Sequence, residues 1–474
     1  MGEWEAVIGL EVHTELRTAT KLFCGCPNAF GVEPNTSVCP VCLGLPGSLP
    51  VLNAKAVELA ITVGLALSSR IQPSQFHRKN YFYPDMPKDY QISQYDVPVN
   101  AGGAVALRSG KVVGIVRAHL EEDTGKLVHR GGGGRIGGAE YSLIDYNRSG
   151  VPLLEIVSEP EISSAEEAKE YVSELRAILV ATGASDGRME EGSLRVDANV
   201  SVRPSGSAEL RTRVEIKNVN SLRSLGRAIG YEIERQIAVY EGGGSILQQT
   251  RHFDEASGET LPLRAKEEAN DYRYFPEPDL PPISPLPAEV ERIASELPLL
   301  PAGRRSRLFE LVEGASPDQV EVAITEEVWP YVATGVDFGV APELVLARAA
   351  NELVALIGDA GLLTPLRFAE VVALEERFSP SQVKLLLKGA VGFDGTVEEL
   401  VARVGLSSSG AEDAKAMVKE VVEANPEEWG RFVAGDAKVA GFLLGQVMRK
   451  FGKAISGAQA RAALDELASG AAGE

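Results

Sequence analysis

Apolar and polar positions alternate along much of the first 290 residues, the pattern of strands with one buried face. The first such strand has apolar and polar side chains on opposite faces: Ile8, Leu10 and Val12 against Glu11, His13 and Glu15. A longer strand over 193–203 repeats the pattern: Leu194, Val196, Ala198, Val200 and Val202 against Arg195, Asp197, Asn199, Ser201 and Arg203. Val214 and Ile216 alternate with Arg213, Glu215 and Lys217 after a turn-like Pro204–Gly206. The last two segments are predicted to pair as a hairpin with both polar faces on one side.

Helical signals are concentrated in the second half of the chain. Before it, Ser163 or Ser164 forms a capping box with a glutamate three residues later, for a helix running to about Ala181. The proline density over 276–301 predicts a boundary without regular elements. Beyond it, helical periodicity occurs in four segments: 343–360, 366–376, 380–389 and 411–424. A second break is predicted near Gly405–Gly410.

These patterns predict an α+β fold, with a mixed α/β domain rich in antiparallel strands over 1–290, a helical domain over 291–405 and a small all-helical tail domain over 406–474. The length of 474 residues also suggests roughly three domains of about 150 residues each. A composition of 44% hydrophobic and 24% charged residues is ordinary for a globular protein.

The net charge restricts the partners. Lys and Arg number 47 against 67 Asp and Glu, so 47 − 67 gives −20. Such acidity repels polyanions, so a nucleic-acid partner needs a locally basic surface or a bound cation. No apolar run reaches the roughly 18 residues of a membrane span, and the first residues lack the basic and apolar regions of a signal peptide. A cytoplasmic protein is therefore expected.

The four cysteines are close together in sequence: Cys24, Cys26, Cys39 and Cys42. Two close pairs separated by a dozen residues indicate a closed, structural zinc site that holds the loop Pro27–Val38. The first pair is C-x-C rather than the commoner C-x-x-C. Four incidental thiols, or a redox pair, are the alternatives.

Carboxylates on the polar strand faces are the candidates for catalysis. The set comprises Glu11, Glu121, Glu122, Asp123, Glu155, Asp197 and Glu215, with the imidazole of His13. Oxygen ligands with one imidazole suit Mg²⁺ or Mn²⁺. The alternative is that these are solvated strand faces. That alternative is weakest for Glu155, because Leu154 and Ile156 flank it and an unpaired charge in an apolar run is costly.

Other motifs are less specific. The glycine run Gly131–Gly134 lacks the Gly-Lys-Ser/Thr ending of a P-loop and is predicted to be a hairpin tip. Four histidines have no ligand spacing and receive no role: His77, His119, His129 and His252. Two segments, Arg78–Asp85 and Asp271–Asp279, interleave basic and aromatic residues as in proteins that bind a single-stranded RNA end. A packed aromatic corner is the alternative.

Taken in order, the motifs resemble the GatB/GatE family, the B component of the aspartyl/glutamyl-tRNA(Asn/Gln) amidotransferase (GatCAB) complex. The matching segments cover nearly the whole chain: Ile8–His13, Arg78–Asp85 with Tyr90–Gln94, Glu121–Lys126, Asp145–Arg148, Pro152–Pro160, Met189–Arg195, Glu215–Ser221, Asp271–Pro281 and Gly441–Met448. The resemblance implies a cradle domain, a helical domain and a tail domain that binds the tRNA body. The tail departs from the family, because Arg449–Lys453 is not followed by the expected Lys-rich stretch.

The resemblance also implies a ligase reaction with ATP. The side-chain carboxylate of Glu-tRNA(Gln) or Asp-tRNA(Asn) is phosphorylated, and ammonia then displaces phosphate to give Gln-tRNA(Gln) or Asn-tRNA(Asn). The implied catalytic residues are Glu11, His13, Glu122, Glu155, Asp197 and Glu215. His13, Glu122 and Glu155 are the implied Mg²⁺ ligands, and the other three hold a second cation or orient ATP and water. The implied tRNA- or ATP-binding residues are Lys79, Asn80, Tyr81, Tyr83, Tyr272, Arg273 and Tyr274.

Partners follow from what the chain lacks. It has no Ser–Ser–Lys amidase signature and no cysteine nucleophile with a paired histidine, so the amidase of the complex, its A component, must supply ammonia. With the small C component, the resemblance implies a heterotrimer. Structural Zn²⁺ at the four cysteines agrees with zinc-bearing members of the family. Two alternatives remain: a non-catalytic, zinc-clipped tRNA-binding scaffold, and a ligase acting on a free amino acid.

Overall fold

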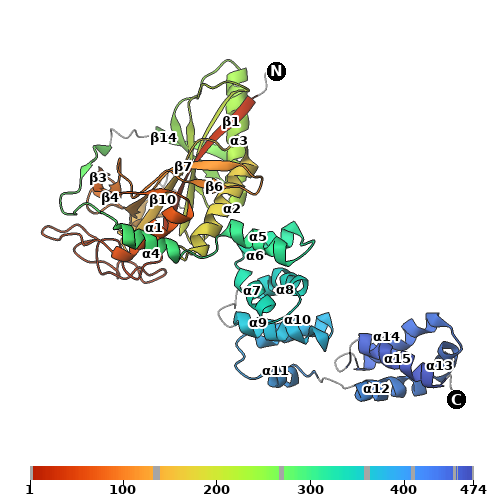
Figure 1. Ribbon diagram of the computed structural model, residues 1–474. Coiled ribbons are helices and arrows are strands. Elements are labelled where there is room, and N and C mark those ends of the chain that lie inside the picture. Colours follow the sequence, from red (N-terminus) through yellow and green to blue (C-terminus); the bar gives the residue numbers. More distant parts are fainter. Residues whose placement is uncertain are drawn as a thin grey trace. The chain divides into compact units, whose positions relative to one another are not determined.

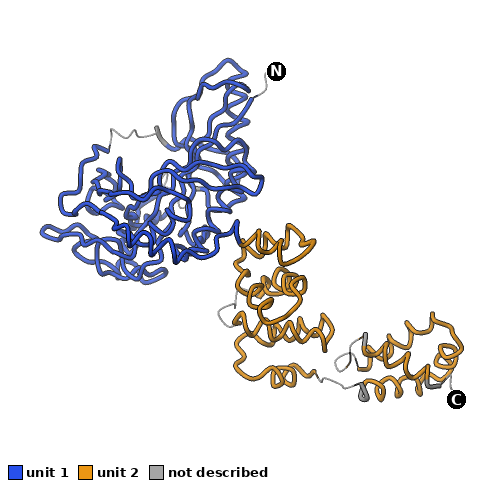
Figure 2. Tube along the Cα trace, viewed as in Figure 1, with its two compact units in different colours: residues 1–303 blue, residues 304–474 orange. Residues whose placement is uncertain are grey.

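The chain divides into two compact units, residues 1–303 and 304–474 (Figure 2). This computed structural model describes residues 4–131, 139–265, 272–356, 363–406, 411–451, 455 and 457–471. Within these ranges no helix is both long enough and apolar enough to cross a membrane.

A 13-stranded sheet runs through the first unit, with main order β14-β13-β12-β11-β1-β10-β7-β4-β3-β15. Along this order every pairing is antiparallel except that of β12 with β13, which confirms the predicted α+β class. The strands are β1 (Trp4–Glu15), β2 (Arg70–Ile71), β3 (Phe76–Asn80), β4 (Tyr90–Gln94), β5 (Asn100–Ala101), β6 (Ala104–Ala106), β7 (Val112–Glu122), β10 (Pro152–Ser158), β11 (Leu194–Pro204), β12 (Val214–Val219), β13 (Gln249–Asp254), β14 (Glu259–Ala265) and β15 (Phe275–Pro276).

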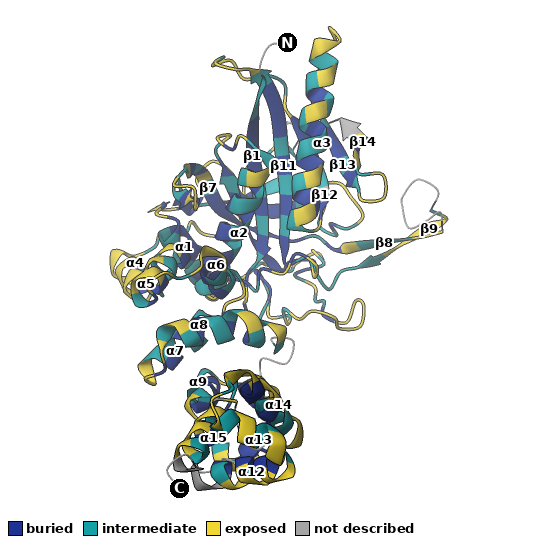
Figure 3. Ribbon diagram, turned by 90° about the vertical axis from the view of Figure 1, so that its right-hand side faces the viewer, coloured by how far each residue is buried: buried dark blue, intermediate teal, exposed yellow. Residues whose placement is uncertain are grey.

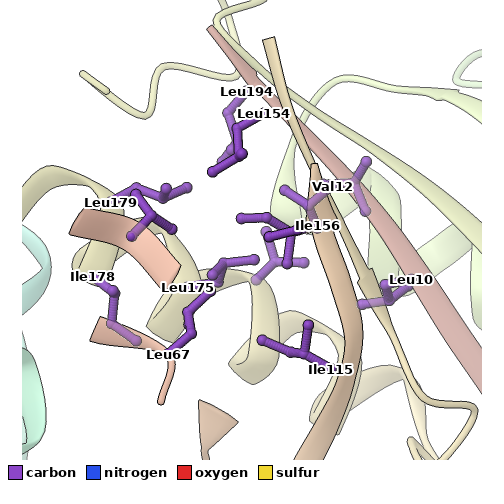
Figure 4. Packing of buried hydrophobic residues seen from close by; sticks show 14 of the residues in the cluster. Leu10, Val12, Leu67, Ile115, Leu154, Ile156, Leu175, Ile178, Leu179 and Leu194 are labelled. Atoms are coloured by element: carbon purple, nitrogen blue, oxygen red, sulfur yellow. The ribbon is translucent and has the colours of Figure 1, made fainter. Parts of the chain in front are cut away.

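Three helices cover one face of this sheet: α1 (Ala54–Ala66), α2 (Ala165–Ala181) and α3 (Leu222–Glu241) (Figure 1). The apolar set of β1 faces them, since Ile8, Leu10 and Val12 are fully buried. Leu154 and Ile156 of β10 pack in the same core (Figure 4). The alternation predicted for 193–203 is likewise confirmed, with buried and less buried residues alternating along much of β11 (Figure 3). The polar side chains of β1, β10 and β11 therefore share the opposite face.

Two local predictions are confirmed in the same unit. Ser164 is the N-cap of α2, its hydroxyl accepting from the Glu167 N–H. Strand β12 pairs antiparallel with β11 and places Glu215 opposite Asn199. A separate hairpin, β8 (Lys126–Arg130) with β9 (Tyr141–Asp145), flanks the glycine-rich segment. Of the predicted tip only Gly131 is described, because 132–138 lie outside the described residues.

The proline-rich stretch does not lack regular structure, contrary to the prediction. Helix α4 (Pro287–Ser295) begins with proline at its first position, where the missing N–H costs nothing and the fixed φ suits a helix. Ile293 of α4 is buried in the core of the first unit, and Arg292 lies 3.6 Å from Glu58 of α1. Residues up to Ser295 therefore pack with the first unit.

The second unit is helical. Its elements are α5 (Pro301–Leu311), α6 (Pro317–Thr325), α7 (Trp329–Asp337), α8 (Pro342–Arg348), η3 (Ala349–Leu353), α9 (Pro365–Ala373), η5 (Leu374–Glu376), α10 (Pro380–Ala390), α11 (Val397–Arg403), α12 (Ala411–Ala424), α13 (Pro426–Val433), η6 (Ala437–Val439), α14 (Ala440–Phe451) and α15 (Gly457–Ala471). They include the helices predicted in four segments, although 357–360 lie outside the described residues. Helices α12, α14 and α15 build a hydrophobic core of their own. The three-domain division stays a prediction, and its second break falls mostly on 407–410, outside the described residues.

Candidate active site

An open hollow of about 1030 Å³ lies on the polar face of the sheet. Strands β1, β3, β7, β10 and β12 contribute charged side chains to it, because their opposite faces are committed to the helix-covered core. The charged and imidazole residues that line it are Glu11, His13, Lys79, Arg117, His119, Glu121, Glu155, Arg213, Glu215 and Lys217. Cations and anions therefore alternate around one cavity in an otherwise acidic protein.

Three predicted or neighbouring side chains converge at the centre of this hollow. His13 on β1 stands opposite Glu155 on β10, and its Nε2 lies 3.5 Å from Glu155 Oε2. The same nitrogen lies 3.8 Å from Glu121 Oε1 on β7. The potential ligand atoms of His13, Glu121 and Glu155 all lie within 4.8 Å of one another. One imidazole and two carboxylates at this spacing form a candidate site for a hard divalent cation.

The electrostatics of this group favour a bound positive charge. Burial alone lowers the pKa of His13, but Glu155, Glu121 and Asp197 outweigh it and raise the pKa to about 9. Burial alone raises the pKa of Glu155, but His119 and His13 hold it well below its usual range. The ring of His13 consequently occupies a position of strongly negative potential.

Glu122 does not join this group, so the sequence-based choice between the two adjacent glutamates is corrected. Its carboxylate points to the other face of β7, accepts the Ile92 N–H at 2.8 Å and forms a buried ion pair with Lys88. Successive strand residues face opposite sides, and Leu120 is buried in the core. Glu122 therefore shares the core-facing side, and Glu121 takes the position beside His13.

His119 is a second residue that sequence reasoning missed. Its Nε2 lies 3.3 Å from Glu155 Oε2 and 3.9 Å from Glu121 Oε2, inside the same hollow. The alternation of Arg117, His119 and Glu121 with apolar residues on β7 was the available signal. Metal-ligand spacing along one chain segment could not detect it, because its nearest carboxylate, that of Glu155, comes from another strand.

A second acidic group lies beside the first. The potential ligand atoms of Glu11, Asp197 and Glu215 lie within 4.8 Å of one another, as the shared polar faces predicted. Lys217 offsets part of the negative charge of this group, with Nζ 2.9 Å from Asp197 Oδ2 and 3.4 Å from Glu215 Oε1. Burial alone lowers the pKa of Lys217, but these carboxylates outweigh it and raise it. The group therefore already holds a cationic side chain.

Only some of the predicted aromatic and basic residues lie at the hollow. Lys79, Tyr272 and Tyr274 line the hollow, with Lys79 Nζ 4.8 Å from the Tyr272 ring centroid. Tyr95, a residue outside the predicted set, stacks on Tyr274 with centroids 4.2 Å apart. Asn80 instead donates its amide to two backbone carbonyls at 2.9 Å, those of 272 and 273. Asn80 thus joins β3 to the second aromatic segment.

The rest of the two aromatic segments lies outside this lining. Tyr81 and Tyr83 stack on each other, with ring centroids 4.6 Å apart. Arg273 adopts a φ of 45°, a backbone conformation that few non-glycine residues use. Phe82 is 67% exposed. Only part of the predicted binding set therefore faces the carboxylates.

A second hollow, of about 1270 Å³, adjoins the first on the same face of the sheet. The two share Glu11, Arg117 and Arg213, and the second adds Arg211. Its floor includes Val7 and Leu210, so it combines apolar surface with three guanidinium groups. The two hollows are therefore continuous at Glu11, Arg117 and Arg213.

The four cysteines come together as predicted. The sulfurs of Cys24, Cys26, Cys39 and Cys42 lie within 4.8 Å of one another, and none forms a disulfide. A hydrogen bond with Cys24, the Cys39 N–H and the Lys21 ammonium lower the pKa of Cys42 to about 5, against the effect of burial. A thiolate is the form that binds zinc, so the cluster could hold a metal ion.

Glu15, at the end of β1, is expected to make the unfolding free energy depend on pH. Burial, aided by Asp123, raises its pKa to about 7, although Arg195 and Arg148 oppose the shift. The unfolded chain, with a pKa near 4.5, loses this proton first, so stability falls as pH rises from 4.5 to 7. Glu15→Gln should therefore raise the unfolding free energy by about 2–3 kcal/mol at pH 8 and by little at pH 4. Urea unfolding at both pH values measures this, and an equal effect at both would contradict it.

Sequence comparisons match both parts of the chain. The sequence model of the "GatB/GatE catalytic domain" matches residues 6–291, and that of the "GatB domain" matches residues 344–467. Three similar proteins are each named as the B subunit of aspartyl/glutamyl-tRNA(Asn/Gln) amidotransferase. The one from Frankia casuarinae is 47% identical over 98% of this chain and 96% of its own length. The one from Nocardia farcinica is 48% identical over 95% of this chain and 93% of its own length. The one from Picosynechococcus is 46% identical over 94% of this chain and 94% of its own length.

Proposed function

Since this chain belongs to the GatB/GatE family, we propose that it catalyses the tRNA-dependent step of an amidotransferase that converts Glu-tRNA(Gln) or Asp-tRNA(Asn) to Gln-tRNA(Gln) or Asn-tRNA(Asn). The names of relatives that match it over nearly their full length support this function. The observation that carries it in the structure is the pair of carboxylate groups, centred on His13 and Lys217, in one basic-lined hollow.

The reaction requires activation, because a carboxylate is a poor acyl donor. A side-chain carboxylate oxygen attacks the γ-phosphorus of ATP, an oxygen–phosphorus bond forms, and the bond to the β-phosphate oxygen breaks to release ADP. The nitrogen of ammonia then attacks the acyl carbon, and phosphate leaves. Both reactants of the first step are anionic, so positive groups must offset their repulsion. In the hollow, Lys79, Arg117 and Arg213 are suited to that task.

The residues present fit a magnesium ion. His13, Glu121 and Glu155 would hold it, because their ligand atoms share one small volume and because carboxylate oxygens dominate the set. When bound, Mg²⁺ offsets the charge of the phosphates and aligns them for transfer. Glu11, Asp197 and Glu215 hold a second cation, or they orient Lys217 toward the reactants. The Tyr95–Tyr274 stack, with Tyr272, offers apolar faces to the 3′ end of tRNA.

Formation of an acyl phosphate tests the proposal. The chain, assembled with its partner proteins, is given [γ-³²P]ATP, Mg²⁺ and Glu-tRNA(Gln) without glutamine or ammonia. We expect ADP release and labelled acyl phosphate that depend on the misacylated tRNA, and none with Gln-tRNA(Gln) as the control. If misacylated tRNA binds but no label transfers, the chain is a tRNA-binding scaffold and the proposal is wrong.

Ammonia must come from elsewhere, so we propose two partners that complete a heterotrimer: the amidase, which is the A component, and the small C component. Within the described residues, the cysteines are grouped in one cluster and none is beside a histidine in a hydrolase arrangement. The isolated chain is therefore expected to release no glutamate from glutamine above the uncatalysed rate. A coupled glutamate assay measures this, with the assembled complex as the positive control, and turnover by the chain alone would contradict the division of labour.

We propose that the cysteine cluster holds a structural Zn²⁺. The segment 27–38 has little hydrophobic core of its own, since Phe30 and Val32 are exposed, so metal ligation supplies much of its local stability. Elemental analysis should find stoichiometric zinc in the wild type and little in Cys39→Ser. Limited proteolysis within 27–38 should be faster in that variant, whereas cleavage within 304–474 should not change. Wild-type protection of the segment after zinc removal would contradict a structural role.

The tail around α12, α14 and α15 is proposed to contact the body of the tRNA. Its basic side chains include Arg449 and Lys450 in the last turn of α14. Because the expected Lys-rich stretch is missing, the salt dependence of tRNA affinity should be modest, with a slope that corresponds to few phosphate contacts.

A further inference from the structure

Glu155 lies between two imidazoles that come from its two neighbouring strands. His13 on β1 and His119 on β7 are both direct cross-strand partners of Glu155 on β10. Their Nε2 atoms lie 3.5 Å and 3.3 Å from the same carboxylate oxygen, Oε2. The side chain of His119 is only 4% exposed. Because both imidazoles contact the same carboxylate oxygen and His119 is buried, the side chain of Glu155 has little freedom to rotate.

The ring of His119 has a defined orientation. Arg117 Nε donates to His119 Nδ1 at 3.4 Å, and a guanidinium cannot accept a hydrogen bond. Nδ1 is therefore the acceptor, and the ring proton is on Nε2, which faces Glu155 and lies 3.9 Å from Glu121 Oε2. Arg117 thus orients the ring of His119 so that its N–H points toward the carboxylates of the candidate cation site.

We propose that His119 is a positioning residue that holds Glu155, and secondarily Glu121, in the arrangement needed to bind the divalent cation, without binding the ion itself. This inference rests on the proposed function, because it concerns the same cation site. The three groups whose ligand atoms cluster within 4.8 Å are His13, Glu121 and Glu155, and His119 is not among them. An imidazole outside the ligand set that donates to a ligating carboxylate fixes its rotamer and lowers the entropy lost on binding.

Manganese binding to the full chain tests this role. Mn²⁺ is titrated by electron paramagnetic resonance into wild type, His119→Phe and His119→Gln, with His129→Gln as control, because His129 belongs to the β8–β9 hairpin outside the hollow. His119→Phe removes the donor but keeps an aromatic ring, and His119→Gln restores an N–H. We expect His119→Phe to weaken Mn²⁺ binding about 10- to 100-fold, His119→Gln to recover part of this loss, and the control to bind as wild type.

Spin-echo modulation from coordinated nitrogen separates positioning from ligation. Wild type and His119→Phe should both show coupling to a single imidazole, which is that of His13. Two imidazoles in wild type and one in His119→Phe would make His119 a ligand and overturn the inference. Unchanged affinity in His119→Phe would also overturn it, as would wild type that binds no Mn²⁺ in this hollow. If His119→Phe does not fold, His119→Leu, which also lacks a donor, takes its place, and Mn²⁺ binding equal to that of wild type in this variant would overturn the inference.

The outcome is separable from that of the proposed function. Mn²⁺ affinity and nitrogen coupling need neither ATP nor tRNA. If acyl phosphate forms normally and Mn²⁺ binding does not depend on His119, the proposed function stands and this inference is wrong. If Mn²⁺ binding depends on His119 but the chain forms no acyl phosphate, this inference stands and the proposed function is wrong.

Discussion

Glu121→Gln is expected to reduce acyl-phosphate formation by at least about 100-fold, whereas Glu122→Gln should leave the cation site intact. The amide keeps the volume of the side chain and can still accept from the Ser93 hydroxyl, which lies 3.3 Å from Glu121 Oε2. It removes the charge that, with Glu155, attracts the cation beside His13. Loss of a group that stabilises developing charge in an active site has effects of this size.

The neighbouring glutamate provides a comparison on the same strand, made under conditions in which both variants are folded, because Glu122→Gln also removes one charge of the buried pair with Lys88. Glu122→Gln makes the same chemical change one residue away, on the opposite face of β7. Single-turnover assays with [γ-³²P]ATP measure the chemical step, and Mn²⁺ titration of both variants measures the site itself. Loss of Mn²⁺ binding in Glu122→Gln, with normal binding in Glu121→Gln, would return the ligand role to Glu122 and contradict the geometry.

Much of the sheet could be predicted because burial leaves a two-residue period in the sequence. The alternation in β1, β11 and β12 is enough to identify the polar face, and with it Glu11, Asp197 and Glu215. The register between strands is not encoded in either strand alone. The acidic group that contains Glu11 and the group around His13 lie in one hollow, beside Lys79 from β3. This arrangement follows from the order of the strands in the sheet and cannot be predicted from the local sequence pattern.

The errors at the site have the same physical origin. The sequence Glu121–Glu122 contains two equivalent carboxylates, and only the phase of β7, set by buried Ala118 and Leu120, decides which one faces the hollow. That phase is present in the sequence, so the glutamate that faces the hollow could have been identified from alternation alone. The position of His119 could not be found in this way, since its closest partner, Glu155, belongs to another strand.

Composition is a poor guide in the proline-rich region and in the aromatic segments. Proline opposes helices in their interior but favours their first turn, and α4 and α5 both begin with one. Asn80 has the chemistry of an RNA contact, yet its amide satisfies backbone carbonyls of the neighbouring segment. A residue type that suits a ligand also suits an unpaired backbone group, and only the fold distinguishes these uses.

The buried ion pair of Lys88 and Glu122 is expected to give the second large effect, on stability rather than on activation. Their side chains are 6% and 2% exposed, and Glu122 also accepts the Ile92 N–H. Removing one charge leaves the other desolvated and unpaired, so Lys88→Met should lower the unfolding free energy by about 3–5 kcal/mol. Hydrogen exchange of β4 and β7 peptides in urea measures the loss where it occurs.

A double-mutant cycle separates the pair from its surroundings. In Lys88→Met/Glu122→Gln neither charge remains, while the amide oxygen can still accept from Ile92, so most of the loss should be recovered. The loss of unfolding free energy in the double variant should be smaller than the sum of the losses in the two single variants, by more than about 1 kcal/mol. The exposed pair Lys55 and Glu58, 2.8 Å apart on α1, is the control and should show coupling below about 1 kcal/mol. Equal coupling in both pairs would mean that burial does not strengthen the interaction of Lys88 with Glu122.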